Sequence, residues 1–224
     1  MEKFKNIPIL YEDNHLLVVI KPSGMPVCKD ASLDIDLLTL LKEYLKEKYQ
    51  KPGNVYLGLV HRLDRPVSGI MVFAKTSKCA KRLSEQIKNH TFSKTYYAIV
   101  CNQLPKKGTL TDYLKKNEEQ NTSYVTTKEK GKLATLDYEI IKTINNLNLV
   151  KINLHTGRHH QIRVQFSSRN TPLFGDYKYN KSKNNNTFSE VALLAKTLTF
   201  NHPTTKELLT FDIELPKKYP WNLF

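Results

Sequence analysis

The sequence has no apolar run long enough to cross a membrane, and only 40% of its 224 residues are hydrophobic. Runs such as Leu16–Ile20 are far shorter than the roughly 18 residues that a spanning helix needs. Residues 1–8 mix charged and polar side chains and lack the apolar stretch of a signal peptide. We therefore expect a cytoplasmic protein that makes no membrane contact. The apolar residues come in patterned runs separated by turn signals, which argues against a disordered chain.

Cysteine is also scarce. The three cysteines, Cys28, Cys79 and Cys101, are odd in number and far apart in the sequence. Their spacing fits neither a disulfide framework nor a Cys-x-x-Cys metal site. We expect them to pack as small apolar side chains. The adjacent pair His159 and His160 does not predict a metal site either, because neighbouring residues on a helix point apart and no third ligand lies nearby.

Acidic residues are outnumbered: 21 Asp and Glu stand against 35 Lys and Arg, which gives a formal charge of +14. A surplus of this size favours a polyanionic partner such as RNA or DNA, because Lys and Arg release counterions when they bind phosphates. The alternative is a lysine-rich surface that is merely solvated. The distribution favours the first interpretation, because eight basic but only two acidic residues lie between His61 and Val100.

Arginine is rare among these cations, and its placement is uneven. Only six of the 35 basic residues are Arg, and four of the six fall within residues 61–66 and 157–163. The planar, permanently charged guanidinium can bind a carboxylate or phosphate through two hydrogen bonds, which Lys cannot match. These two segments are therefore candidate functional sites. Their arginines are Arg62, Arg65, Arg158 and Arg163.

Strand patterns outnumber helix patterns along the chain. We expect Ser32 or Asp34 to cap the first helix and Ser77 to cap the second. Residues 104–132 are charged with little periodicity and predict a surface loop or hairpin, while 178–186 predict a loop. Apolar patterns predict strands at 16–20, 55–60, 70–74, 95–101, 136–140, 150–154, 198–200 and 209–215, and helices at 34–49, 77–90 and 160–168.

About eight strands and three helices, with many strands adjacent in sequence, indicate an α+β fold. We expect a largely antiparallel mixed β-sheet with flanking helices. No internal repeat is visible, and the length fits one large domain or two small ones. We interpret residues 1–224 as a single domain.

Asp64 lies between Arg62 and Arg65 at the end of an apolar run. A carboxylate in such a place needs compensation, and an adjacent guanidinium would favour its ionised form by lowering its pKa. On this observation alone, a structural ion pair and a functional carboxylate both fit.

The wider context of Asp64 favours function. The segment His61-Arg62-Leu63-Asp64-Arg65 closely resembles the catalytic loop of the RluA family of RNA pseudouridine synthases. Three other segments resemble that family in the same order along the chain: Lys21-Pro22-Ser23-Gly24, Lys94-Thr95-Tyr96-Tyr97-Ala98-Ile99-Val100 and Gly157-Arg158-His159-His160-Gln161-Ile162-Arg163. Two features depart from the family. Pro66-Val67 stands where Asp-Thr is commoner, and no additional RNA-binding domain precedes Leu10.

The resemblance implies a pseudouridine synthase fold with a central basic cleft, and three catalytic residues. Asp64 takes the place of the essential aspartate, Tyr96 that of the active-site tyrosine, and Arg163 that of the arginine that pairs with the catalytic carboxylate. The reaction breaks the bond from N1 to C1′ of uridine, turns the uracil, and joins C5 to C1′. No step transfers electrons or phosphate, so we expect no cofactor and no metal.

The expected partner is structured RNA, either ribosomal or transfer RNA, and we expect the protein to be a monomer. A target uridine must leave the base stack before it can react. By analogy with the family, Arg62 would fill the space left behind or bind the rearranged backbone. The residues expected to contact RNA are His61, Arg62, Arg65, Lys78, Lys81, Arg82, Arg158 and His160.

Three other functions fit the sequence less well than RNA pseudouridine synthesis. A protein kinase is disfavoured because its His-Arg-Asp spacing differs by one residue from that of His61-Arg62-Leu63-Asp64, and no Gly-rich loop or Asp-Phe-Gly is found. A two-carboxylate hydrolase would need a second acidic residue in a motif near Asp64, and neither of the segments 61–66 and 157–163 contains one. A non-catalytic RNA-binding or ribosome-assembly module on the same fold is the remaining alternative, although retention of Asp64, Tyr96 and Arg163 together argues against it.

Overall fold

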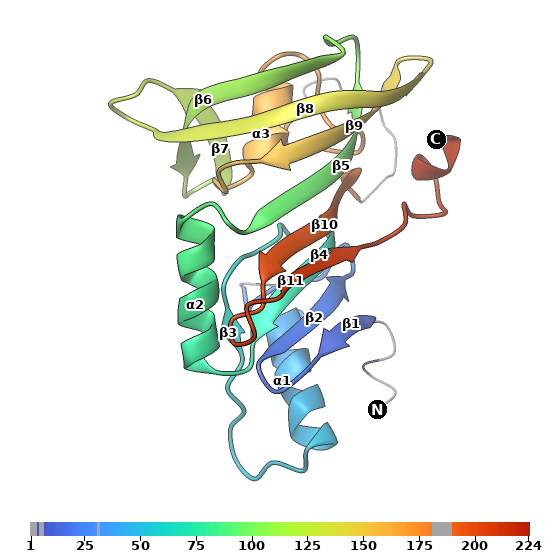
Figure 1. Cartoon of the computed structure of the whole chain (residues 1–224). Coiled ribbons are helices and arrows are strands. Elements are labelled where there is room, and N and C mark those ends of the chain that lie inside the picture. Colours follow the sequence, from blue (N-terminus) through green and yellow to red (C-terminus); the bar gives the residue numbers. More distant parts are fainter. Residues whose placement is uncertain (1–3, 5–6, 31, 181–189) are drawn as a thin grey trace. The chain divides into compact units, whose positions relative to one another are not determined.

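The computed structural model describes the chain except for residues 1–3, 5–6, 31 and 181–189. Two compact units are seen (Figure 1). The first comprises Met1–Ser93 with Thr197–Ile213, and the second comprises Lys94–Lys196 with Glu214–Phe224. The larger part of the second unit, Lys94–Lys196, thus interrupts the sequence of the first, and its last residues follow the first unit. The single catalytic domain expected for the whole chain stays a prediction.

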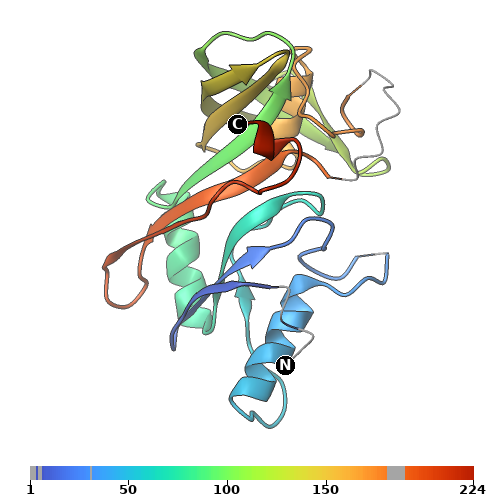
Figure 2. The ribbon, with the colours of Figure 1, turned by 90° about the vertical axis from the view of Figure 1, so that its right-hand side faces the viewer.

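The first unit contains short antiparallel strands with an apolar interior. In the pair β2–β4, Val18 lies opposite Val72, and both are fully buried. The last part of β10 pairs with β11 as a hairpin (Figure 2). Leu198 and Phe200 of this hairpin join the core formed by β2, β4 and α2. The strands are β1 (Ile9–Glu12), β2 (Leu16–Lys21), β3 (Gly58–Leu59), β4 (Ser68–Ala74), β11 (Leu208–Asp212) and, from Thr197 onward, β10 (Leu193–Asn201).

Two helices belong to the first unit, α1 (Leu37–Lys48) and α2 (Ser77–Lys88). The expected caps are each displaced. Asp36, rather than Ser32 or Asp34, caps α1, because its carboxylate accepts a hydrogen bond from the Thr39 amide at 3.0 Å. Thr76, rather than Ser77, caps α2 through the Cys79 amide at 3.2 Å. Cys79 packs in the core of this unit, as expected for a small apolar side chain.

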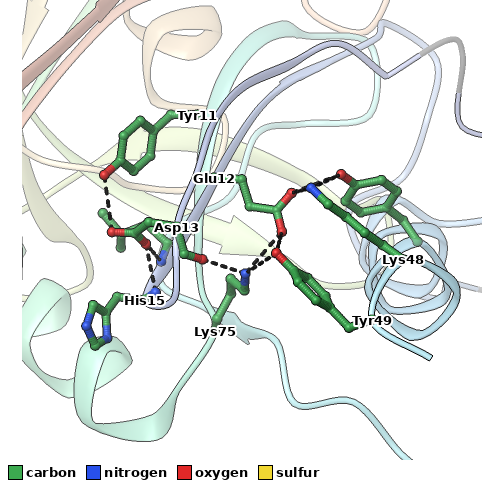
Figure 3. Close-up of polar contacts among 9 residues, drawn as sticks. Tyr11, Glu12, Asp13, His15, Lys48, Tyr49 and Lys75 are labelled. Atoms are coloured by element: carbon green, nitrogen blue, oxygen red, sulfur yellow. Dashed lines mark hydrogen bonds and ion pairs between the residues drawn. The ribbon is translucent and has the colours of Figure 1, made fainter. Parts of the chain in front are cut away.

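A cluster of charged side chains ties β1 to α1 and to the end of β4 (Figure 3). Glu12 accepts hydrogen bonds from Lys48 at 2.7 Å, Lys75 at 3.0 Å and the Tyr49 hydroxyl at 2.6 Å. Burial alone would raise the pKa of Glu12, but these hydrogen bonds lower it to about 2. The carboxylate therefore stays ionised and paired across the physiological pH range.

The second unit is an antiparallel sheet in the order β5-β9-β8-β6-β7. Its buried face packs against α3 (Gln161–Ser167), where Phe166 meets Tyr138 edge-on at 5.5 Å between ring centroids. A short 3₁₀ helix, Trp221–Leu223, lies near the end of the chain. The strands are β5 (Ser93–Cys101), β6 (Lys107–Asn117), β7 (Thr122–Thr126), β8 (Lys132–Ile144) and β9 (Leu147–Leu154).

The expected α+β class with mostly antiparallel strands is confirmed. Residues 104–132 form a hairpin of β6 and β7, so the alternative of a loop was wrong. Most of the strand expected at 55–60 is also irregular, since only Gly58–Leu59 pair. The loop expected at 178–186 lies largely outside the described residues. Within the part of the chain that is described, no helix is long and apolar enough to cross a membrane.

Candidate active site

Asp64 lies on a short irregular segment between β3 and β4 in the first unit. The side chains of Leu63 and Val67 are buried on either side of it. The Val67 amide donates to the Asp64 backbone carbonyl at 3.0 Å, which closes a turn that begins at Asp64. The His61 imidazole fixes the start of the segment, because its Nε2 accepts a hydrogen bond from the Val72 amide at 3.1 Å. The backbone that carries Asp64 is thus held from both sides.

A buried lysine is hydrogen-bonded to the backbone of this segment. Lys21 is completely buried, and its Nζ donates to the carbonyls of Pro22 at 2.8 Å and Arg65 at 3.1 Å. Burial lowers the pKa of Lys21 to about 8, while the negative charge of Asp64 favours the cation. A lysine with a pKa near 8 is mostly charged at neutral pH. It therefore places a positive charge in the electrostatic field of Asp64.

Tyr96 lies on β5 in the second unit. Its side chain is buried and it pairs across the sheet with Ile152 on β9. Strand β5 is fixed on this side by seven consecutive antiparallel pairs, from Thr95 to Cys101. The phenol thus projects from a rigid strand rather than from a loop.

Arg163 is one half of a buried ion pair on α3. Its Nε donates to Oδ2 of Asp176 at 2.7 Å, and its Nη2 donates to Oδ1 at 2.8 Å. The two side chains are only 4% and 1% exposed, so this is a bidentate pair with both charges removed from water. The predicted pairing of Arg163 with Asp64 stays a prediction. What the structure adds is a second carboxylate that fixes the direction of the guanidinium.

The sequence alone does not single out Asp176, because a Gly-Asp pair is typical of an ordinary turn. Gly175 has a φ of +75°, and a Cβ at this position would lie 2.2 Å from the Glu190 carbonyl oxygen. Only glycine fits both conditions. The glycine therefore turns the backbone so that the next residue can reach Arg163.

Tyr179 and His160 complete the surroundings of Arg163. The guanidinium lies 5.0 Å from the centre of the Tyr179 ring, which is a cation–π distance. The Tyr179 hydroxyl accepts from the Ser123 amide at 2.7 Å and lies 2.6 Å from Nδ1 of His160. Burial, and then the charge of Arg163, lower the pKa of His160 to about 2. His160 is therefore a neutral imidazole that braces Tyr179, and its expected contact with RNA stays a prediction.

The pKa of His160 predicts acid sensitivity. Below pH 6.5 the unfolded chain takes up a proton on this imidazole, whereas the folded protein does not until about pH 2. The free energy of unfolding should therefore fall by about 1.4 kcal/mol per pH unit in this window from His160 alone. In His160→Asn, which suits the left-handed φ of 54°, urea unfolding between pH 7 and 5 should lose this slope. Equal slopes in both proteins would contradict the assignment.

The other expected RNA contacts lie in both units. Arg62 is exposed beside Asp64, and Lys78 and Lys81 are exposed on α2. Arg82 is partly buried and donates to the Pro203 carbonyl at 2.8 Å. In the second unit, Arg158 is exposed and its Nε donates to the Leu133 carbonyl at 2.8 Å. The exposure and hydrogen bonds of these side chains do not decide whether they bind RNA, so the contacts stay predictions.

Comparison with known proteins assigns the family. The family model for RNA pseudouridylate synthase matches residues 15–168. The chain is 34% identical over 221 residues to ribosomal large subunit pseudouridine synthase D of Zymomonas mobilis, covering 94% of this chain and 70% of that protein. It is 34% identical over 212 residues to ribosomal large subunit pseudouridine synthase C of Buchnera aphidicola, covering 91% of this chain and 65% of that protein.

The fold agrees with a solved structure. Human RNA pseudouridylate synthase domain containing 4 superposes with a TM-score of 0.77 over 94% of this chain and 89% of that one, at 22% identity. At this identity the likeness concerns the fold alone. The sequence matches go further, since one covers more than half of the chain and another exceeds 30% identity over nearly all of it. The chain therefore belongs to the RNA pseudouridylate synthase family and is an isomerase of the pseudouridine synthase class.

Proposed function

We propose that this protein isomerises uridine to pseudouridine in large-subunit ribosomal RNA, with Asp64 as the catalytic carboxylate and residues 1–224 as the catalytic domain. The relatives named as ribosomal large subunit synthases support this choice of RNA, and the charge of +14 suits a polyanionic substrate. The observation that carries the proposal is the placement of Asp64 on a braced turn, with the buried cation of Lys21 in its electrostatic field.

In the proposed mechanism Asp64 acts as an anion. It attacks the sugar or the base, or it removes a sugar proton, and each of these routes needs the ionised carboxylate. The N1–C1′ bond breaks, the uracil turns within the site, and a bond from C5 to C1′ forms. The proton on C5 is then lost and N1 carries a proton, so the product is an isomer of the substrate.

Tyr96 and Arg163 have distinct roles in this proposal. The Tyr96 ring stacks on the uracil while it turns, and its oxygen, once the hydroxyl proton has been lost to solvent, accepts the C5 proton and so becomes a neutral phenol again. Arg163 helps keep the catalytic carboxylate ionised and directed, which a forked guanidinium does better than a lysine. Since no step moves electrons or phosphate, the proposed reaction proceeds with these side chains alone.

The exposed face of α2 is proposed to follow RNA phosphates. Each contact should add about 0.7 to 0.9 to the slope of log K against log salt. We therefore expect Lys78→Ala/Lys81→Ala to reduce that slope by about 1.5 in filter-binding measurements on ribosomal RNA fragments. Lys46→Ala, an exposed lysine on α1, is the matched control. An unchanged slope in the double variant would remove α2 from the contact surface.

The experiment that tests the proposal is a map of pseudouridine at nucleotide resolution. Total RNA from cells with and without this gene would be compared by carbodiimide labelling, and purified protein would be added to transcribed ribosomal and transfer RNA. We expect one or a few sites in large-subunit RNA to disappear with the gene and to reappear with the purified protein. Formation of pseudouridine only in transfer RNA would overturn the proposal that large-subunit ribosomal RNA is the substrate. No pseudouridine in either RNA, despite tight binding, would favour the non-catalytic RNA-binding module.

A further inference from the structure

Arg65 follows Asp64 directly in the sequence, and its side chain holds another part of the chain. The guanidinium Nε donates to the Gly24 carbonyl at 2.9 Å, and Nη1 donates to the Ser32 hydroxyl at 2.9 Å. Nη2 donates to the Asp34 carboxylate, and Nη1 lies 3.9 Å from Asp30. All of these acceptors belong to residues 24–30 and 32–34, which together we call the strap. The fork of Arg65 is thus directed at the strap in this structure.

Other hydrogen bonds join the same two parts of the chain, and in these the donors lie at or just before the strap and the acceptors on the Asp64 turn. The Gly24 amide donates to the Arg65 carbonyl at 2.9 Å. The Ser23 hydroxyl donates to the Pro66 carbonyl at 2.8 Å, and Lys21 Nζ also reaches the Arg65 carbonyl. The turn with Asp64 and the start of the strap are therefore joined through main chain and side chain together. Arg65 extends this connection to the far part of the strap, at Asp30, Ser32 and Asp34.

Stability alone does not explain this use of an arginine. The side chains of Arg65, Asp34 and Asp30 are 43%, 51% and 44% exposed. Ion pairs exposed to this degree contribute about 0 to 1 kcal/mol to the free energy of unfolding. By contrast, a displacement of about 1 Å in a reacting group can lower a rate by about a hundredfold. The contacts of Arg65 should therefore affect the reaction rate, through the position of Asp64, more than they affect the free energy of unfolding.

We propose that Arg65 is a positioning residue that fixes the Asp64 turn by clamping it to the strap, and that it is not a phosphate contact. This proposal rests on the proposed function, because Asp64 is taken as the catalytic carboxylate. It replaces the role in RNA binding that sequence analysis assigned to Arg65. It also gives Ser32 and Asp34 a role in the reaction, although neither touches the substrate.

Two variants separate the two roles of Arg65. Arg65→Lys keeps the positive charge but loses the fork, so a phosphate contact would largely survive and a clamp would not. Asp34→Asn removes a negative charge, which by electrostatics alone should strengthen RNA binding. If Arg65 is a clamp, both variants should lower kcat, by about tenfold or more for Arg65→Lys, while neither weakens RNA binding or lowers its salt slope. Arg169→Lys is the matched control, because Arg169 forms a similar fork with Asp112 in the second unit.

Hydrogen exchange supplies a readout that does not depend on activity. The Gly24 amide bonds to the Arg65 carbonyl and the Val67 amide to the Asp64 carbonyl, so both should exchange faster in Arg65→Lys than in the parent. The inference is overturned if Arg65→Lys keeps parental kcat and exchange while Arg65→Ala weakens binding and lowers the salt slope by about one. If the parent protein makes no pseudouridine, the proposed function fails, and the exchange data still decide whether Arg65 clamps the turn.

Discussion

Asp64→Asn should abolish isomerisation while leaving RNA binding nearly intact. The amide has the shape of the carboxylate but carries no negative charge, so it can neither attack a carbon nor accept a proton. Loss of such a group typically costs a factor of about 10² to 10⁴, and we expect at least the upper part of this range in single-turnover assays. RNA affinity should fall by less than about threefold, because the substitution removes a negative charge and so adds no repulsion between the protein and the RNA phosphates.

The matched control for this variant is Asp137→Asn. Asp137 is an aspartate on β8 that is 44% exposed and pairs with His155 rather than with any residue of the proposed mechanism. It should retain parental activity. Near-parental activity of Asp64→Asn would remove Asp64 from the mechanism, whatever the variant does to stability.

Asp176→Asn should cause the largest loss of stability among the substitutions considered. Removing one partner of a buried pair leaves the other charge uncompensated, which costs about 3 to 5 kcal/mol. For a protein of this size that corresponds to a fall in Tm of about 6 to 20 °C. Thermal and urea unfolding measure the effect, and Asp137→Asn, from an exposed pair, should change it by less than about 1 kcal/mol. A fall in Tm of only 1 or 2 °C would contradict the burial of this pair.

A double variant separates stability from catalysis at the same position. Arg163→Met/Asp176→Leu replaces both charges with apolar side chains of similar volume, which is often neutral for stability. We expect it to recover much of the stability lost in Asp176→Asn and none of the activity. If activity returned with stability, the role of Arg163 would be structural only.

The fold could be predicted where buried residues repeat in the sequence. Strands β2 and β4 and helices α1 and α2 all have such patterns, and their residue ranges agree with the prediction to within a few positions. Strand β1 has no fully buried residue, so it leaves no apolar pattern and is defined by its partner β2. In β6 only Leu110 and Leu114 are buried, which explains why its eleven residues looked like a loop.

The candidate site divides in the same way. Asp64, Tyr96 and Arg163 could be proposed from contiguous motifs. The contacts around them could not be predicted, because they join residues far apart in the chain: Lys21 and Arg65 are 44 positions apart, and His160 and Tyr179 are 19 apart. A lysine after an apolar strand and an aspartate after a glycine are common in turns, so neither stands out before the fold is known.

The interruption of the first unit's sequence by Lys94–Lys196 has a consequence for synthesis on the ribosome. The core of the first unit needs Leu198 and Phe200, which follow its other members by more than a hundred residues. At about 5 to 20 residues per second, the chain takes roughly 5 to 20 s to extend from Ser93 to Thr197. Throughout that time the apolar face that receives the β10–β11 hairpin lacks its cover. The first unit, although it begins the chain, can complete its core only after Lys94–Lys196, the larger part of the second unit, has been synthesised.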